Sequence, residues 1–247
     1  MCFLPLTPNI YNHQVKKHLI LFLLLGVPPL FYIFYVTFAQ NKYKKQPYYG
    51  ARLDTFTAYN RKGKPYIDTV YHKIADFSFT DQNSRTYNST DSLNGRIYVA
   101  HFFYATPNGL SKSLIYQFTR VQSAFSENPK VRLVSFTVNP ERDTPEKMNL
   151  FAQKNGINYP KWVVLSGNRT EIETLAQKSF LQLNSGSQND GFFNSSRAIV
   201  IDDEGHIRGI YDGTSARPTD EMMGAIRGLL IEYTNRKPLL KALNAKN

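Results

Sequence analysis

The stretch from His101 to Lys112 constrains the fold more than any other part of the chain. An apolar, β-prone run from Ile97 to Phe103 leads into it, and Pro107 and Gly109 then break the pattern. From Leu110 onward, apolar residues recur at three- and four-residue spacing, which is typical of a helix that packs one face on a sheet. The pattern predicts a buried strand, a tight loop and a helix.

The chain has a single cysteine, Cys2, so the loop between this strand and helix holds none. One cysteine cannot form a disulfide within the chain, and no Cys-x-x-Cys or cysteine-rich metal site exists. Thiol–disulfide exchange requires a thiolate at the reacting site. We therefore expect that the protein is not an enzyme of the thiol–disulfide oxidoreductase type.

An uncharged segment from Leu19 to Ala39 precedes the rest of the chain. A helix of about 21 residues is roughly 30 Å long, which matches the hydrocarbon core of a bilayer. We favour a retained transmembrane anchor over a cleaved signal peptide, for which Thr37 to Ala39 offers only a weak cleavage site. Lysines flank both ends of the segment, so charge does not decide its orientation.

The remaining sequence alternates strand and helix patterns in the order β-β, β-α-β-α-β-α-β-β-α. This order predicts an α/β fold with a mixed sheet flanked by helices. The predicted organisation is a short N-terminal tail (1–18), a transmembrane helix (19–39), an irregular linker or extension (40–73), one folded domain (74–234) and a frayed basic tail (235–247).

The net charge of +11 allows nucleic acid or an anionic membrane as a partner. The basic residues are spread along the chain, and no basic–aromatic nucleic-acid motif is present. We therefore expect no nucleic-acid partner and a solvated basic surface beside a membrane.

Three segments resemble the Sco/SenC family, and the similarity extends from about Ile74 to Leu230. The most specific is Val134 to Glu146, which contains Asn-Pro-Glu-Arg-Asp-Thr where the family has Asp-Pro-Glu-Arg-Asp-Thr, so Asn139 replaces an aspartate. The segments from Trp162 to Gly167 and from Ile201 to Thr214 support it. The resemblance implies a thioredoxin-like fold, a membrane anchor, an extracytoplasmic (periplasmic) domain and a role in copper handling for cytochrome c oxidase assembly.

The departures from the family fall on its copper ligands. The resemblance places the two ligand cysteines at Thr106 and Leu110 and the ligand histidine at Asn194. Copper(I) prefers sulfur ligands, and imidazole serves either oxidation state, so none of these three side chains is a suitable replacement. We therefore predict no metal, no cofactor and no catalytic residue at this site.

A replacement site would need other donors, and neither the spacing nor the context of the available side chains favours one. The candidates are His72, His101, His206, Met148, Met222 and Met223. We interpret His101 as a core or surface residue and the methionines as core residues. Asp143 and Glu141 precede a predicted helix, where carboxylates stabilise free N–H groups, so we prefer that role to acid–base catalysis.

A polar and aromatic patch remains around the altered loop. Its expected members are Tyr104, Thr106, Pro107, Asn108, Phe192, Phe193 and Asn194. These side chains could bind a partner protein or fill the space that a metal would occupy, and the sequence leaves both alternatives open.

We expect a single-pass membrane protein of the Sco/SenC type that acts by protein binding as a non-metal, non-redox accessory or assembly factor. The expected partners are the membrane and a protein, for example a Sco paralogue or an oxidase subunit. The alternative is a copper chaperone for cytochrome c oxidase that uses atypical ligands, such as His101 with a methionine.

Overall fold

The computed structural model describes residues 9–38, 45–59, 63–103, 109–181 and 196–244. The chain divides into two units, 1–44 and 45–247. The first unit contains helix α1 (Asn9–Phe38), which covers the predicted span except Ala39, a residue outside the described part. The described apolar side chains between Ile20 and Tyr35 are exposed. Within the residues described, no helix has both the length and the apolar character needed to cross a membrane.

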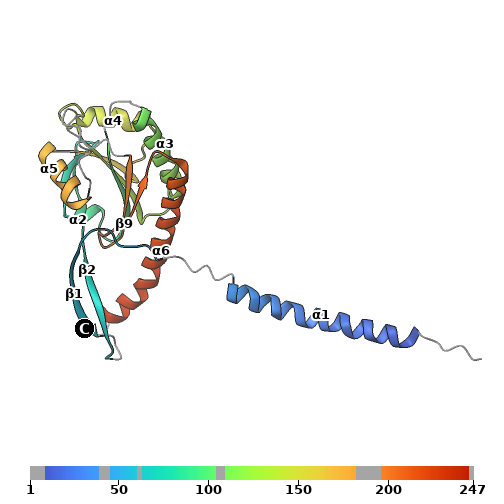
Figure 1. Cartoon of the computed structure of the whole chain (residues 1–247). Coiled ribbons are helices and arrows are strands. Elements are labelled where there is room, and N and C mark those ends of the chain that lie inside the picture. The colour runs from blue at the N-terminus through green and yellow to red at the C-terminus, as the bar shows by residue number, and fades with distance from the viewer. Residues whose placement is uncertain (1–8, 39–44, 60–62, 104–108, 182–195, 245–247) are drawn as a thin grey trace, which may run out of the picture. The chain divides into compact units, whose positions relative to one another are not determined.

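The second unit is built on a seven-stranded mixed sheet, as the sequence predicts (Figure 1). The strand order is β4-β3-β7-β6-β5-β8-β9, in which β5, β6 and β7 are parallel and the other pairs are antiparallel. The strands are β3 (Ser78–Asp81), β4 (Thr86–Asn88), β5 (Ile97–Phe103), β6 (Val131–Thr137), β7 (Trp162–Ser166), β8 (Arg197–Ile201) and β9 (Ile207–Asp212).

Helices cover both faces of this sheet, and each face has its own apolar core. The helices are α2 (Ser89–Ser92), α3 (Gly109–Ala124), α4 (Pro145–Lys154), α5 (Arg169–Thr174) with the π-helical turn η1 (Leu175–Ser179), and α6 (Ala216–Asn244). Side chains of α3, α4 and α6, such as Phe118, Met148 and Met222, pack on one face. Those of α5 and η1 pack on the other face, against Phe102 and Phe136. Alternation along β5 supplies both cores, because neighbouring strand residues point to opposite faces.

Two parts of the predicted organisation are wrong. The stretch expected to be an irregular linker contains a regular antiparallel hairpin of β1 (Arg52–Tyr59) and β2 (Pro65–Tyr71), a separate two-stranded sheet. Its threonines, tyrosines and β-branched residues favour strands. The C-terminal tail expected to fray from Asn235 is instead helical, since α6 continues through Asn244. The leucine, alanine and lysine residues of that segment are good helix formers.

The strand ends lie along two opposite edges of the sheet. One edge carries the C-terminal ends of β5, β6 and β7 and the start of β8, which is antiparallel to β5. The opposite edge carries the start of β5 and the turn between β8 and β9, because Tyr98 pairs with Ile201.

Candidate functional site

The sequence places the family ligand positions after β5 and before β8. Phe103 closes β5, and Arg197 opens the neighbouring strand β8, so the chain leaves and re-enters the sheet at the same edge. Ser196 anchors this entry, because its backbone oxygen accepts a 2.6 Å hydrogen bond from the N–H of Gly213.

The predicted site residues themselves lie outside the part of the chain that the structure describes. This holds for Tyr104, Thr106, Pro107, Asn108, Phe192, Phe193 and Asn194. Leu110 belongs to the first turn of α3, but its side chain is likewise not described. The partner-binding patch and the loss of the copper ligands therefore stay predictions from the sequence.

His101, the histidine nearest this edge, is a core residue. It is fully buried on β5, and its ring lies 4.1 Å from that of Phe118, between ring centroids. Nδ1 of His101 lies 3.4 Å from Oγ of Ser135, which accepts a 2.6 Å hydrogen bond from Nε1–H of Trp162. Burial lowers the pKa of His101 to about 3, so the ring is neutral at pH 7.

Nε2 of His101 has no hydrogen-bond partner among the described residues. Oγ of Ser135 lies between the indole N–H of Trp162 and Nδ1 of His101. The ring of His101 makes an edge-on aromatic contact with Phe118. Aromatic packing therefore accounts for the position of His101 in the core.

The methionine candidates also lie in the core, as predicted. Met148 and Met222 are fully buried and Met223 is nearly so, all within the cluster on the α3–α4–α6 face. Another of the candidate histidines, His72, places its Nε2 2.7 Å from the backbone oxygen of Ser179.

The carboxylates near the β5 edge have structural partners. Asp143 is buried and accepts a hydrogen bond from the hydroxyl of Thr137, while exposed Glu141 lies 3.5 Å from Arg169. Both contacts are with side chains, and not with the free N–H groups of α4 for which the two carboxylates were predicted. Thr144 stands at the N-cap position of α4, but its side chain makes no capping hydrogen bond.

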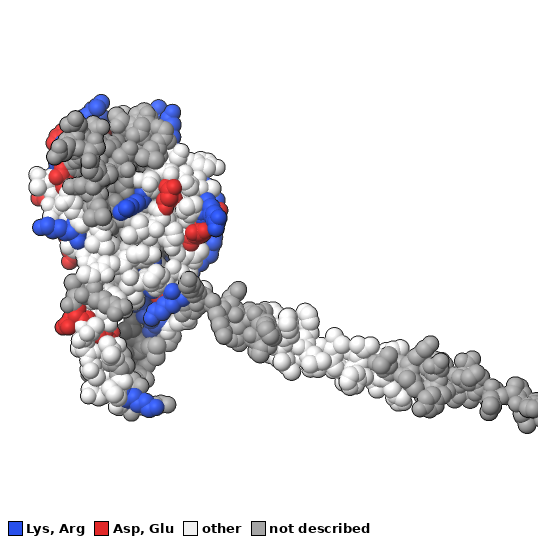
Figure 2. Space-filling view, viewed as in Figure 1, with Lys and Arg blue, Asp and Glu red and all other residues white. Residues whose placement is uncertain are grey.

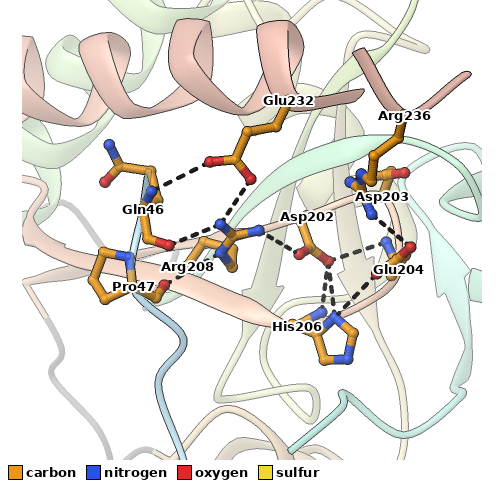
Figure 3. Close-up of polar contacts among 9 residues, drawn as sticks. All are labelled: Gln46, Pro47, Asp202, Asp203, Glu204, His206, Arg208, Glu232 and Arg236. Carbon is orange, nitrogen blue, oxygen red and sulfur yellow. Dashed lines mark hydrogen bonds and ion pairs between the residues drawn. The ribbon is translucent and has the colours of Figure 1, made fainter. Parts of the chain in front are cut away.

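The opposite edge holds a polar cluster that the sequence did not predict, centred on Arg208 (Figure 3). Arg208 lies on β9 with a fully buried side chain, and its Nη1 is 2.9 Å from Oδ2 of Asp202. Its Nη2 is 2.9 Å from Oε2 of Glu232 on α6 and 2.8 Å from the backbone oxygen of Gln46. Burial opposes the charge of Arg208, but hydrogen bonds from its guanidinium to Asp202 and Glu232 outweigh this and raise its pKa.

The cluster also contains the only group of three potential metal ligands found among the described residues, namely Asp202, Glu204 and His206. Oδ1 of Asp202 already accepts from the backbone N–H groups of Glu204 and His206, and Oδ2 accepts from Arg208. Nη1 of Arg236 lies 2.5 Å from Oε1 of Glu204. Two carboxylates paired with arginines, and no sulfur, do not fit the ligand preference of copper(I).

A mixed sheet with three central parallel strands, helices on both faces and a strand–loop–helix at β5–α3 defines a thioredoxin-like domain. The chain belongs to the SCO1/SenC family, whose model matches residues 68–230. The SCO1 protein homolog of Bacillus subtilis is 26% identical over 168 residues, which cover 67% of this chain and 86% of that protein. A SCO2-like protein of Rickettsia prowazekii is 25% identical over 154 residues, or 59% and 73% of the two chains.

Solved structures show the same fold. A SCO1/SenC family lipoprotein of Bacillus anthracis aligns with a TM-score of 0.58 and 24% identity, covering 64% of this chain and 95% of that one. BsSco, described as a cytochrome c oxidase assembly protein with a disulfide switch, aligns with a TM-score of 0.56 and 25% identity over 64% and 93% of the two chains.

Proposed function

We propose that this protein is a Sco/SenC-family accessory or assembly factor that acts by binding a protein, without metal or redox chemistry of its own. The observation that carries the proposal is the single cysteine, Cys2. A disulfide switch of the kind described for BsSco requires two cysteines. The family fold is kept here without the pair of cysteines that such a switch requires.

The positions of the other candidate copper ligands support this proposal. Of the histidines and methionines considered as replacements, His101, Met148 and Met222 are fully buried among aromatic and aliphatic side chains. A copper chaperone with atypical ligands would need such groups to reach the β5 edge together. The relation to cytochrome c oxidase rests on family membership and on the description of BsSco.

The proposal includes a retained N-terminal anchor that holds the folded domain on the extracytoplasmic side of a membrane. The uncharged run from Leu19 to Ala39 in the sequence supports it. The mass of the membrane-extracted protein distinguishes an intact chain from one cleaved after Ala39. Resistance to sodium carbonate extraction distinguishes an anchored chain from a peripheral one.

Introducing the family's copper ligands at the three substituted positions tests the binding-only function. The resulting chain serves as a positive control for copper binding. In a Cys2→Ser background, we expect Thr106→Cys, Leu110→Cys and Asn194→His together to create a site that binds one copper ion per chain. The Cys2→Ser chain alone should bind none. Equal copper binding by both chains would refute the proposal, because the donors would then lie elsewhere.

A further inference from the structure

A small cavity of about 200 Å³ lies at the edge of the sheet where β5 begins. Its walls come from three parts of the chain, namely the segment just before β3, helix α2 with the turn that follows it, and the β8–β9 turn. Backbone hydrogen bonds join these parts: the N–H of Ile74 donates to the oxygen of Gly205 at 2.9 Å, and that of Gly95 donates to the oxygen of Asp203 at 3.2 Å. The backbone around the cavity is therefore fixed in position.

Tyr98, near the start of β5, lines this cavity with a hydroxyl that no other residue of the described chain hydrogen-bonds. The residue is only 4% exposed. Burial raises the pKa of Tyr98, and the nearby Tyr87, Asp202 and Asp76 raise it further, so the phenol is neutral at pH 7. Buried hydroxyl groups almost always have a hydrogen-bond partner. The hydroxyl of Tyr98 therefore indicates that the cavity receives a polar group from outside the described chain.

Negative charge is concentrated around the cavity. Four carboxylates line it, those of Asp76, Asp202, Asp203 and Glu204, and a single lysine, Lys73, stands against them. On the visible face of the domain, by contrast, basic and acidic side chains are scattered (Figure 2). The charge of the lining favours a ligand that carries a positive charge.

The carboxylate of Asp76 is the one most available to such a ligand. Both oxygens of Asp202 accept hydrogen bonds within the chain, and Oδ1 of Asp203 lies 2.5 Å from Nη2 of Arg236 (Figure 3). Burial raises the pKa of Asp203, Arg236 opposes this, and the carboxylate of Asp202 adds to it. Asp76 is exposed, has no ion pair within the described residues, and lies near enough to Tyr98 to raise its pKa. A cation bound between Asp76 and Tyr98 would satisfy both groups.

Apolar side chains form the rest of the wall. Ile74, Phe77 and Leu93 line the cavity and are buried. A cavity of about 150 Å³ can hold benzene, so this one suits a ligand of about five to eight heavy atoms. A primary ammonium group has three N–H donors and no acceptor, which matches a phenolic oxygen beside a carboxylate. A short aliphatic chain attached to it would contact the apolar wall.

We propose that this cavity binds a primary alkylammonium group, which donates hydrogen bonds to the phenolic oxygen of Tyr98 and to the carboxylate of Asp76 and packs its methylene groups against Phe77. Free amines carry this group, and so does the side chain of a lysine presented by another protein. The site lies at the sheet edge opposite the end of β5 and uses neither metal nor sulfur. Binding at this cavity is therefore independent of the proposed function.

The test uses the full-length chain in a neutral detergent, with its tyrosine rings labelled with ¹³C and with n-butylammonium as the probe. The signal of Tyr98 is the one that disappears in Tyr98→Phe. The matched control ligand is 1-butanol, which has the same number of heavy atoms without the charge. Tyr116, which is 66% exposed on α3, gives the reference signal outside the cavity.

We expect a saturable shift of the Tyr98 signal with a millimolar dissociation constant for n-butylammonium, and binding of 1-butanol that is at least about fivefold weaker. Asp76→Asn should weaken ammonium binding by up to about fivefold, the range for a solvent-exposed ion pair. Lys73→Gln should strengthen it by a similar factor, because a like charge is removed. Asp220→Asn, which changes an exposed acid of α6, is the control and should have no effect.

Tyr98→Phe removes the hydroxyl and keeps the ring, so the domain should stay folded, because no hydrogen bond within the described chain is lost. Ammonium binding to this variant, measured from the signals of the ligand, should weaken by about tenfold or more, because a hydrogen bond to a charged group is removed. Unchanged affinity would show that the ammonium group does not contact Tyr98 and would overturn the proposal.

The proposal also fails if the Tyr98 signal shows no saturable shift, since water alone would then occupy the cavity. Equal affinity for n-butylammonium and 1-butanol would overturn it, as would weaker ammonium binding by Lys73→Gln, which would indicate an anion site. A peptide with one lysine, compared with its norleucine counterpart, identifies the source of the group. Binding of the lysine peptide supports a protein as the source, and binding of n-butylammonium alone supports a free amine.

Discussion

The guanidinium of Arg208 and the carboxylate of Asp202 form an ion pair of 2.9 Å in which both side chains are completely buried. The pair lies at the edge of the sheet opposite the end of β5, and Glu232 completes it from α6. Burial alone would raise the pKa of Asp202, but hydrogen bonds from His206 and Arg208 outweigh it and lower that pKa. The buried guanidinium of Arg208 therefore joins β9 to α6 and to the chain segment at Gln46.

Removing Arg208 should destabilise the domain strongly. Arg208→Ala leaves the carboxylates of Asp202 and Glu232 without their cation, and breaking a buried pair in this way costs about 3–5 kcal/mol. Urea unfolding of residues 45–247 measures the loss. The matched control is Arg217→Ala, whose ion pair with Glu221 is exposed and is worth about 0–1 kcal/mol. Equal effects of the two variants would contradict the account of the cluster.

Removing the hydroxyl of Ser135 should leave the indole N–H of Trp162 buried without an acceptor. The expected cost for Ser135→Ala is about 1–3 kcal/mol, the range for an unsatisfied buried donor. Trp162 is the only tryptophan, so its fluorescence reports unfolding directly. Ser123→Ala, at an exposed position of α3, is the control and should change stability by less than about 0.5 kcal/mol. Unchanged stability of the Ser135 variant would show that the hydrogen bond is not formed.

His101 should make the stability of the domain fall in acid. Its folded pKa of about 3 lies below the ordinary value of 6.5, so between these values the unfolded chain binds more protons than the folded chain. The contribution of His101 is complete above pH 6.5 and decreases by up to about 1.4 kcal/mol per pH unit below it. The residues whose rings pack against it, Phe103, Phe118 and Trp162, do not titrate in this range.

The measurement is urea unfolding between pH 7 and pH 4 for the wild type and for His101→Phe, which keeps an aromatic ring between the same neighbours. The variant should show a shallower acid decline, and His72→Gln, at a partly buried position, serves as the comparison. If His101→Phe and the wild type lose stability with the same slope, the histidine is not buried as a neutral ring.

Much of the sheet could be predicted from local patterns. The apolar run before Pro107 and the helical spacing after Leu110 correctly located β5 and α3, because both elements bury a continuous apolar surface. The β1–β2 hairpin was missed for the opposite reason: it buries little, so its exposed tyrosines and threonines carry no core pattern. Strand propensity around the Arg61–Lys64 turn was the available signal.

The Arg208 cluster could not be inferred from local sequence. Its partners lie 6, 24 and 162 residues away, and an arginine between Ile207 and Gly209 looks like an ordinary solvent-facing strand residue. Only the tertiary fold brings Glu232 and Gln46 to it. The interpretation of the methionines as core residues was correct, because their positions follow the apolar periodicity of α4 and α6. For His101 the sequence left core and surface open, and the structure places it in the core.

The absence of copper chemistry is tested most directly by titrating residues 45–247 with Cu(I) and Cu(II) separately, against a competing chelator. The fragment should begin at Lys45, because Arg208 holds the backbone of Gln46 and Pro47. We predict no binding tighter than about micromolar, near −8 kcal/mol. One equivalent of copper bound at nanomolar or better affinity would contradict a binding-only function and show that ligands foreign to the family have taken over the site.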